Sequence, residues 1–155
     1  LKVSGGPTTI VDYAHTPDAL KNVLETIKAV KQTDSRLITV IGCGGDRDKE
    51  KRPIMAAIAS DMSEQLILTS DNPRTEAPSA ILNDMQKGLD DQQLNNAFVM
   101  EDRKEAIKLA VKLANESDVI LIAGKGHEKY QEIDGVRYDF DDYEIASEFT
   151  NQMTP

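Results

Sequence analysis

Apolar residues along this chain alternate between short continuous runs and stretches with helical spacing. The runs are rich in β-branched residues and predict five strands, near residues 8–12, 36–41, 65–70, 97–100 and 118–123. Between the runs, apolar side chains recur every three or four positions, as at Leu20, Leu24 and Ile27, which predicts amphipathic helices. The resulting β-α-β-α order predicts an α/β fold with a mostly parallel sheet covered by helices on both faces.

Local signals mark where some of these elements begin and end. Thr16 is a good helix N-cap and is followed by Pro17, which suits the first helical position. Near the end of the chain, Asp134-Gly135 separates two short strand-like runs. This predicts a C-terminal antiparallel hairpin, followed by a last helix after residue 142. The polar stretch 90–96 predicts a surface loop.

Composition and charge limit the class of protein. A length of 155 residues suits one domain, and a net charge of −9 argues against general affinity for nucleic acid. No apolar run approaches the ~20 residues that span a bilayer and no signal-peptide pattern opens the chain, so we expect no membrane association and a cytoplasmic location. Because the first residue is Leu1 rather than Met, we expect an excised fragment or a processed product.

Four of the expected strands end in polar or glycine-rich loops, which a parallel sheet gathers at one edge, where such folds bind ligands. In the loop 42–52, glycines and four cations favour either an anion site, with Arg47 gripping a carboxylate or phosphate, or a flexible turn before a solvated basic patch. Cys43 is the single cysteine, which excludes an internal disulfide and fits a reducing compartment. It is either a nucleophile or a small residue that fills the loop.

The other loops carry acids and cations in close spacing. Asp71-Asn72-Pro73-Arg74 holds an acid and a cation in a defined relation, which suits a zwitterionic ligand or, alternatively, an Asx turn with an exposed arginine. In the loop 124–128, Glu128 is a candidate for binding an ammonium group, but Gly126 after the lysine departs from the Walker pattern. Asp12 is either a partner for ribose hydroxyls or a local cap.

Four motifs occur in order: Asp-Tyr-Ala-His-Thr-Pro-Asp at 12–18, Gly-Cys-Gly-Gly-Asp-Arg-Asp-Lys at 42–49, Asp-Asn-Pro-Arg at 71–74 and Gly-Lys-Gly-His-Glu at 124–128. Together they resemble the C-terminal, Rossmann-like domain of the bacterial Mur ligases, over nearly all of residues 1–155. Within that family, Asp-Asn-Pro-Arg resembles the members that add meso-diaminopimelate, because lysine-adding members depart from this pattern.

The resemblance implies an ATP-dependent, ADP-forming ligase of peptidoglycan synthesis that joins meso-diaminopimelate to UDP-MurNAc-L-Ala-D-Glu. In the family, a UDP-sugar domain and a central ATPase domain precede this one. The P-loop, a carbamylated lysine and the Mg²⁺ ligands belong to the central domain, so this chain alone is expected to be inactive.

The motifs carry over an expected site. The positions that resemble the diaminopimelate site are Arg47, Asp71, Asn72, Pro73, Arg74, Gly124 and Glu128. Asp12 and His15 resemble positions that contact ATP, and we assign no catalytic residue and no metal ligand in this chain.

Two other classes compete with this interpretation. A phospho-receiver-like signalling domain would also place acids after strands one and three and a lysine after strand five, as Asp12, Asp71 and Lys125 are placed here. Tyr13 breaks the acid pair that such a domain needs for Mg²⁺. A folylpolyglutamate synthase-type ligase domain is the second alternative, and the Asp-Asn-Pro-Arg motif argues against it.

Overall fold

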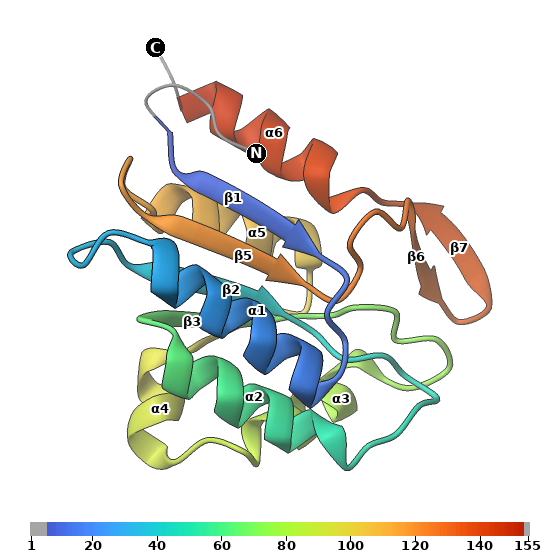
Figure 1. Ribbon diagram of the computed structural model, residues 1–155. Coiled ribbons are helices and arrows are strands. Elements are labelled where there is room, and N and C mark those ends of the chain that lie inside the picture. The colour runs from blue at the N-terminus through green and yellow to red at the C-terminus, as the bar shows by residue number, and fades with distance from the viewer. Residues whose placement is uncertain (1–5, 154–155) are drawn as a thin grey trace.

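The structure, a computed structural model, describes residues 6–153 (Figure 1). Strands and helices alternate along most of the chain, as the apolar pattern predicts. In chain order the elements are β1 (Thr8–Asp12), α1 (Pro17–Val30), β2 (Leu37–Ile41), α2 (Lys51–Met62), β3 (Gln65–Leu68), α3 (Pro78–Gln86), α4 (Asp91–Asn96), β4 (Phe98–Val99), α5 (Arg103–Leu113), β5 (Val119–Ala123), β6 (Tyr130–Ile133), β7 (Val136–Asp139) and α6 (Asp142–Met153).

Five strands form one parallel sheet in the order β1-β5-β2-β3-β4. β5 therefore lies between the first two strands of the chain, with Ile120 aligned to Thr9 on one side and to Ile38 on the other. β6 and β7 form an antiparallel hairpin as a separate two-stranded sheet. The expected α/β fold, with its mostly parallel sheet and C-terminal hairpin, is confirmed.

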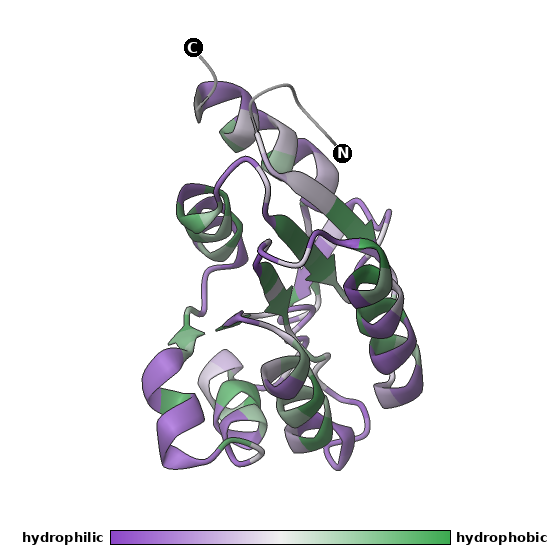
Figure 2. Cartoon of the chain, turned by 60° about the vertical axis from the view of Figure 1, so that its left-hand side comes forward, coloured by the Kyte–Doolittle hydropathy of each residue, from purple (hydrophilic) through white to green (hydrophobic). Residues whose placement is uncertain are grey.

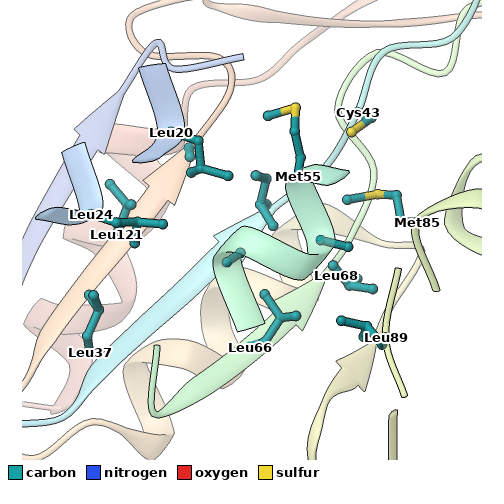
Figure 3. Packing of buried hydrophobic residues seen from close by; sticks show 14 of the residues in the cluster. Leu20, Leu24, Leu37, Cys43, Met55, Leu66, Leu68, Met85, Leu89 and Leu121 are labelled. Atoms are coloured by element: carbon teal, nitrogen blue, oxygen red, sulfur yellow. The ribbon is translucent and has the colours of Figure 1, made fainter. Parts of the chain in front are cut away.

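Each face of the sheet is covered by its own layer of helices. Side chains of β2 alternate between the faces, so that Leu37 and Ile41 pack under α1, α2 and α3, whereas Ile38 and Val40 pack under α5 and α6. Figure 2 shows the apolar strands between these layers, and Figure 3 shows Leu20 and Met55 reaching the sheet from α1 and α2. Each fully buried side chain of this kind stabilises the fold by roughly 1.5–3 kcal/mol.

Local signals predict most, but not all, of the element ends. The Thr16 hydroxyl accepts a hydrogen bond from the Ala19 N–H at 3.2 Å, and Pro17 begins α1, as expected. The prediction of a loop at 90–96 is wrong, because this segment is the helix α4. Asp90 and Gln93 form a capping box there, each side chain accepting from the other's backbone N–H. None of the helices between residues 6 and 153 combines the length and apolarity needed to cross a bilayer.

The chain changes sides of the sheet after β4, because α5 covers the second face. The helices that follow β1 and β2 cover one face, whereas α6, which follows β5 and the hairpin, covers the other (Figure 1). The connections leaving neighbouring strands thus diverge on either side of the carboxyl end of β5. Parallel α/β sheets bind their ligands at such a point.

Candidate functional site

The loops that follow β2, β3 and β5 meet at this point. The Gly45 N–H donates to the Asn72 carbonyl oxygen at 2.8 Å, and a Cβ on Gly45 would collide with the Pro73 carbonyl. In the loop after β5, a Cβ on Gly124 would lie 3.2 Å from the Asp71 carboxylate and 3.7 Å from the Gly42 carbonyl. Glycine at these positions therefore allows three backbones to approach one another closely.

Two adjacent glycines test this packing. Gly45→Ala is expected to destabilise the chain by roughly 1–3 kcal/mol, because the new methyl group meets rigid backbone at Pro73. Gly44→Ala is the matched control, because its methyl group meets the ends of long side chains, chiefly the Arg74 guanidinium, and no backbone. Its cost should stay below about 1 kcal/mol. Urea unfolding measures both, and equal losses would contradict the assigned contacts.

A buried lysine, Lys125, lies at the centre of the three loops and is fully excluded from solvent. Its ammonium group donates to Asn72 Oδ1 at 2.6 Å and to the Tyr130 carbonyl at 2.8 Å. The same nitrogen lies 3.3 Å from Asp71 Oδ1 and 3.5 Å from Glu128 Oε1. Lys125 thus joins three residues of the expected amino-acid site, Asp71, Asn72 and Glu128, and the sequence analysis does not include it in that site.

Burial lowers the pKa of Lys125, and the charges of Asp71 and Glu128 oppose this effect. The Asn72 side chain extends the network, because its amide nitrogen lies 3.4 Å from Glu128 Oε1 and its oxygen also accepts from the Glu132 N–H at 3.0 Å. Gln131 adds a third link by donating to the Asp71 carbonyl at 2.7 Å. The hairpin therefore belongs to the support of this acidic cluster.

Arg74 lies beside the cluster in a left-handed backbone conformation, with φ at 52°. Its N–H donates to the Glu132 carbonyl at 3.0 Å and its carbonyl accepts from the Asp134 N–H at 2.7 Å, which joins this loop to the hairpin. The half-buried guanidinium donates to the Gly45 carbonyl at 3.0 Å. A side chain at this position is directed along the loop that follows β2.

Arg47 belongs to this same loop after β2 and is exposed to solvent. Its guanidinium donates to the Asp46 carbonyl at 2.9 Å, and its Cγ lies 3.7 Å from the position of a Cβ on Gly44. The Arg74 guanidinium lies 2.8 Å from that same position. The structure thus places both Arg47 and Arg74 beside Gly44, although Arg47 makes no contact with the Lys125 cluster.

A second network fastens the loop after β2 to the loop after β3. The buried guanidinium of Arg52 donates to both oxygens of Glu76, at 3.0 and 2.9 Å, and to Asp84 at 3.0 Å. Glu76 also accepts from the Asp46 N–H at 2.8 Å, and Asp46 in turn accepts from the Thr75 hydroxyl at 2.7 Å. The hydrogen bonds from Arg52, together with that from Asp46, lower the pKa of Glu76 to about 2.

This shift predicts a dependence of stability on pH. Because the pKa of Glu76 in the folded chain is about 2, below its ordinary value of 4.5, its contribution is complete above pH 4.5 and is lost as the pH falls toward 2. Glu76→Gln should lower the free energy of unfolding at pH 7 and flatten its fall between those pH values. Urea unfolding across this range measures the effect, with Glu25→Gln on α1 as the control. An unchanged slope in Glu76→Gln would refute the assignment.

A buried ion pair supports the site from the opposite face of the sheet. Arg103 Nε and one terminal nitrogen donate to Asp142 at 2.9 and 2.7 Å, and both side chains are completely buried. The guanidinium also donates to the carbonyls of Ser70 and Ala123, at 3.0 and 3.3 Å. Arg103 therefore ties α6 to the ends of β3 and β5, and no motif in the sequence marks this role.

The expected nucleotide residues lie apart from the acidic cluster, at the end of β1. Asp12 Oδ2 accepts from the Ala14 N–H at 2.8 Å, which is the local turn that the sequence left open as an alternative. His15 Nδ1 donates to the Tyr13 carbonyl at 2.9 Å, so the neutral ring keeps Nε2 as an acceptor.

A hollow of about 570 Å³ opens beside Asp12. Its walls come from β1, from the loop after β5 and from the start of α6, and they include Tyr13, His127 and Tyr143. Aromatic walls beside a carboxylate fit a nucleoside, because a base stacks on the rings and ribose hydroxyls donate to the acid. Across residues 6–153, no three His, Cys, Asp or Glu side chains are grouped so that they could hold a metal ion.

Cys43 is a loop filler in this structure. Its side chain is buried, and burial raises the pKa of the thiol to about 12. A thiol that is neutral at physiological pH and shielded from solvent is a poor nucleophile.

Comparison with known proteins identifies the family to which this chain belongs. The model of the Mur ligase glutamate ligase domain matches residues 1–126. The chain belongs to the Mur ligase family. A curated relative from Bacteroides thetaiotaomicron, named UDP-N-acetylmuramoyl-L-alanyl-D-glutamate--2,6-diaminopimelate ligase, is 56% identical over 146 residues, which are 94% of this chain and 30% of the relative. A relative of the same name from Cytophaga hutchinsonii is 57% identical, with the same coverage.

Solved structures agree with this assignment. A structure described as UDP-N-acetylmuramoyl-L-alanyl-D-glutamate--2,6-diaminopimelate ligase matches with a TM-score of 0.86 and 49% identity, over 93% of this Mur ligase domain and 29% of that chain. A folylpolyglutamate synthase from Mycobacterium tuberculosis, complexed with ADP and AMPPCP, matches with a TM-score of 0.57 at 19% identity and shares the fold. This Mur ligase domain spans about 30% of the length of its curated relatives.

The phospho-receiver alternative is wrong. Receiver domains have the strand order 2-1-3-4-5, in which the first and third strands are neighbours and bring their acids together. In this Mur ligase domain β5 and β2 separate β1 from β3, so Asp12 and Asp71 follow strands that do not touch.

Proposed function

We propose that this domain forms the amino-acid site and part of the ATP site of a ligase that joins meso-diaminopimelate to UDP-MurNAc-L-Ala-D-Glu in peptidoglycan synthesis. The observation that carries the proposal is that the loops after β2, β3 and β5 bring two carboxylates, Asp71 and Glu128 beside Lys125, and the guanidinium of Arg74 to one edge of the sheet. The names of relatives with more than half of their aligned residues identical support this choice of substrates.

The chemistry of diaminopimelate matches this arrangement. Its distal carbon carries both a carboxylate and an ammonium group, and the carboxylate distinguishes it from lysine. We assign the carboxylate to Arg74 and Arg47 beside Gly44, since a guanidinium binds a carboxylate through two parallel hydrogen bonds. Glu128 and Asp71 receive the ammonium group. Asn72 and Pro73 shape the loop, and Gly124 leaves room for the ligand to approach.

The domain contributes binding and orientation to the reaction. ATP, when bound, supplies the phosphoryl group that activates the D-glutamate carboxylate for attack by the amine of diaminopimelate. By holding the distal end of diaminopimelate, Arg74 and Glu128 leave the other amino group free to meet the activated carboxylate. Fixing two reactants in this way lowers the entropic part of the barrier.

The proposal also covers the contacts of this domain with ATP and the parts of the enzyme that lie outside this chain. Asp12 and His15 face ATP from this domain, beside the aromatic hollow. The P-loop, the Mg²⁺ ligands and the UDP-sugar site lie in the larger part of the full-length enzyme, because the relatives are about three times as long as this chain. We propose that the chain alone is inactive and that its partner is the central domain of the same protein. ATP use and an unpaired Cys43 fit a cytoplasmic location.

The test is substrate selection by the full-length enzyme. Release of ADP is measured with UDP-MurNAc-L-Ala-D-Glu and either meso-diaminopimelate or L-lysine, and separately with a folate and L-glutamate. We expect kcat/KM to favour diaminopimelate over lysine by at least about 100-fold, because lysine leaves the arginines unpaired. Equal use of lysine would refute the diaminopimelate assignment, and ligation of glutamate to folate would favour a folylpolyglutamate synthase.

A further inference from the structure

Lys125 divides its contacts between two kinds of oxygen. The short hydrogen bonds, at 2.6 and 2.8 Å, go to neutral acceptors, Asn72 Oδ1 and the Tyr130 carbonyl. The longer contacts, at 3.3 and 3.5 Å, go to the carboxylates of Asp71 and Glu128. The lysine therefore neutralises the acids through its charge, while most of its hydrogen-bonding capacity is used elsewhere.

Charge, rather than a hydrogen bond to Oδ1, holds the Asp71 carboxylate in the cluster. Asp71 Oδ1 is buried, and no group in the described part of the chain, residues 6–153, makes a hydrogen bond to it. The two carboxylates and one lysine leave a net charge of −1, which one further cation balances. Arg103, the other cation near Asp71, is engaged with Asp142.

We propose that Lys125 is a positioning residue for the incoming amino acid: it fixes Asp71, Asn72 and Glu128 and sets the charge of the cluster so that one substrate ammonium group is bound. This inference rests on the proposed function, since it deepens the role of the same site. Lys125 does not touch the substrate in this scheme. It acts through the carboxylates that do.

Removing the lysine charge should change both the affinity and its pH dependence. In Lys125→Met, Asp71 and Glu128 lose their shared counter-ion, and Asn72 loses its short hydrogen bond. Two neighbouring carboxylates repel each other's charge, so one of them takes up a proton at a higher pH than before. Arg103 on α5 still interacts by charge with both carboxylates. A protonated acid binds ammonium poorly, which predicts weaker amino-acid binding at low pH.

The experiment uses the full-length ligase carrying Lys125→Met, with Lys112→Met on the exposed side of α5 as the matched control. We expect the KM for meso-diaminopimelate to rise at least about 30-fold, with the KM values for ATP and UDP-MurNAc-L-Ala-D-Glu within about threefold of wild type. The acid limb of kcat/KM for diaminopimelate should move up by about one pH unit. An unchanged KM for diaminopimelate, or an equal rise of all three KM values, would overturn the inference.

A second variant keeps the test decisive if Lys125→Met does not fold. Lys125→Arg retains the charge, but its planar guanidinium cannot reproduce both short hydrogen bonds. We expect a smaller rise in KM that is still confined to diaminopimelate, and an acid limb of kcat/KM at the same pH as in wild type. A rise in all three KM values would contradict the positioning role of Lys125. Wild-type enzyme that does not ligate diaminopimelate would refute the proposed function. Active wild-type enzyme with unselective variants would refute only the role of Lys125.

Discussion

Arg74→Ala in the full-length ligase is expected to raise the KM for meso-diaminopimelate by about 30-fold to several thousand-fold, because truncating one partner of a buried charge pair costs roughly 2–5 kcal/mol. The guanidinium is held against the Gly45 carbonyl, and the backbone of Arg74 is fixed by the hairpin, so its position is set before the substrate binds. Steady-state kinetics with each substrate varied in turn measure the effect, and the KM for ATP should not change.

The substrate itself provides a control for this prediction. L-lysine lacks the distal carboxylate, so its weak use should be almost the same in wild type and in Arg74→Ala. Arg74→Lys retains a positive charge but cannot make two parallel hydrogen bonds to the carboxylate. We therefore expect a KM for diaminopimelate between those of wild type and Arg74→Ala. If Arg74→Ala impaired lysine and diaminopimelate equally, its role would be in folding the loop rather than in recognising the carboxylate.

Arg103→Met is expected to destabilise the chain by about 3–5 kcal/mol, because it leaves the Asp142 carboxylate buried without a counter-ion. The carbonyls of Ser70 and Ala123 lose their donors in the same variant, which adds to the loss. Urea unfolding of the chain measures the change. The exposed pair Lys21–Glu25 is the control, and Lys21→Met should cost less than about 1 kcal/mol.

A double variant separates the charge from the packing. Arg103→Met combined with Asp142→Leu removes both charges and fills the site with apolar atoms, which often restores the stability lost by breaking such a pair. We expect it to recover more than half of the loss. A double variant as unstable as Arg103→Met would show that the carbonyl contacts, rather than the unpaired carboxylate, dominate.

Much of the fold could be predicted from the sequence, because its signals are local. Five β-branched runs and the stretches of helical spacing between them define most of the elements, and Asp134-Gly135 defines the hairpin. The segment 90–96 was mistaken for a loop because its polar residues bury nothing. Its helix depends on the capping box of Asp90 and Gln93. The position of β5 between β1 and β2 could not be predicted from the sequence, since it depends on pairing between residues more than 70 positions apart.

The candidate site also has one part that the sequence predicts and another that it does not. Its surface residues, such as Arg74 and Glu128, stand in loops whose composition is unusual enough to notice. Its internal supports, Arg52, Lys125 and Arg103, are cations whose burial no local signal marks, because that burial depends on partners brought in from other elements. Arg103, for example, meets Asp142 39 positions later in the chain. A charged residue in a sequence indicates solvent exposure by default, and only the assembled fold reveals the exceptions.

The central place of β5 also has a consequence for synthesis on the ribosome. Thr8 in β1 pairs with Val119, so the first strand of the sheet has no hydrogen-bonded strand neighbour until most of the domain has emerged. β2, β3 and β4 pair with one another in chain order and are free to associate earlier. Late insertion of β5 then joins β1 to the sheet and assembles the ligand edge in a single step. Until that step, the nascent chain exposes β1 as an unpaired strand, the kind of surface that chaperones protect.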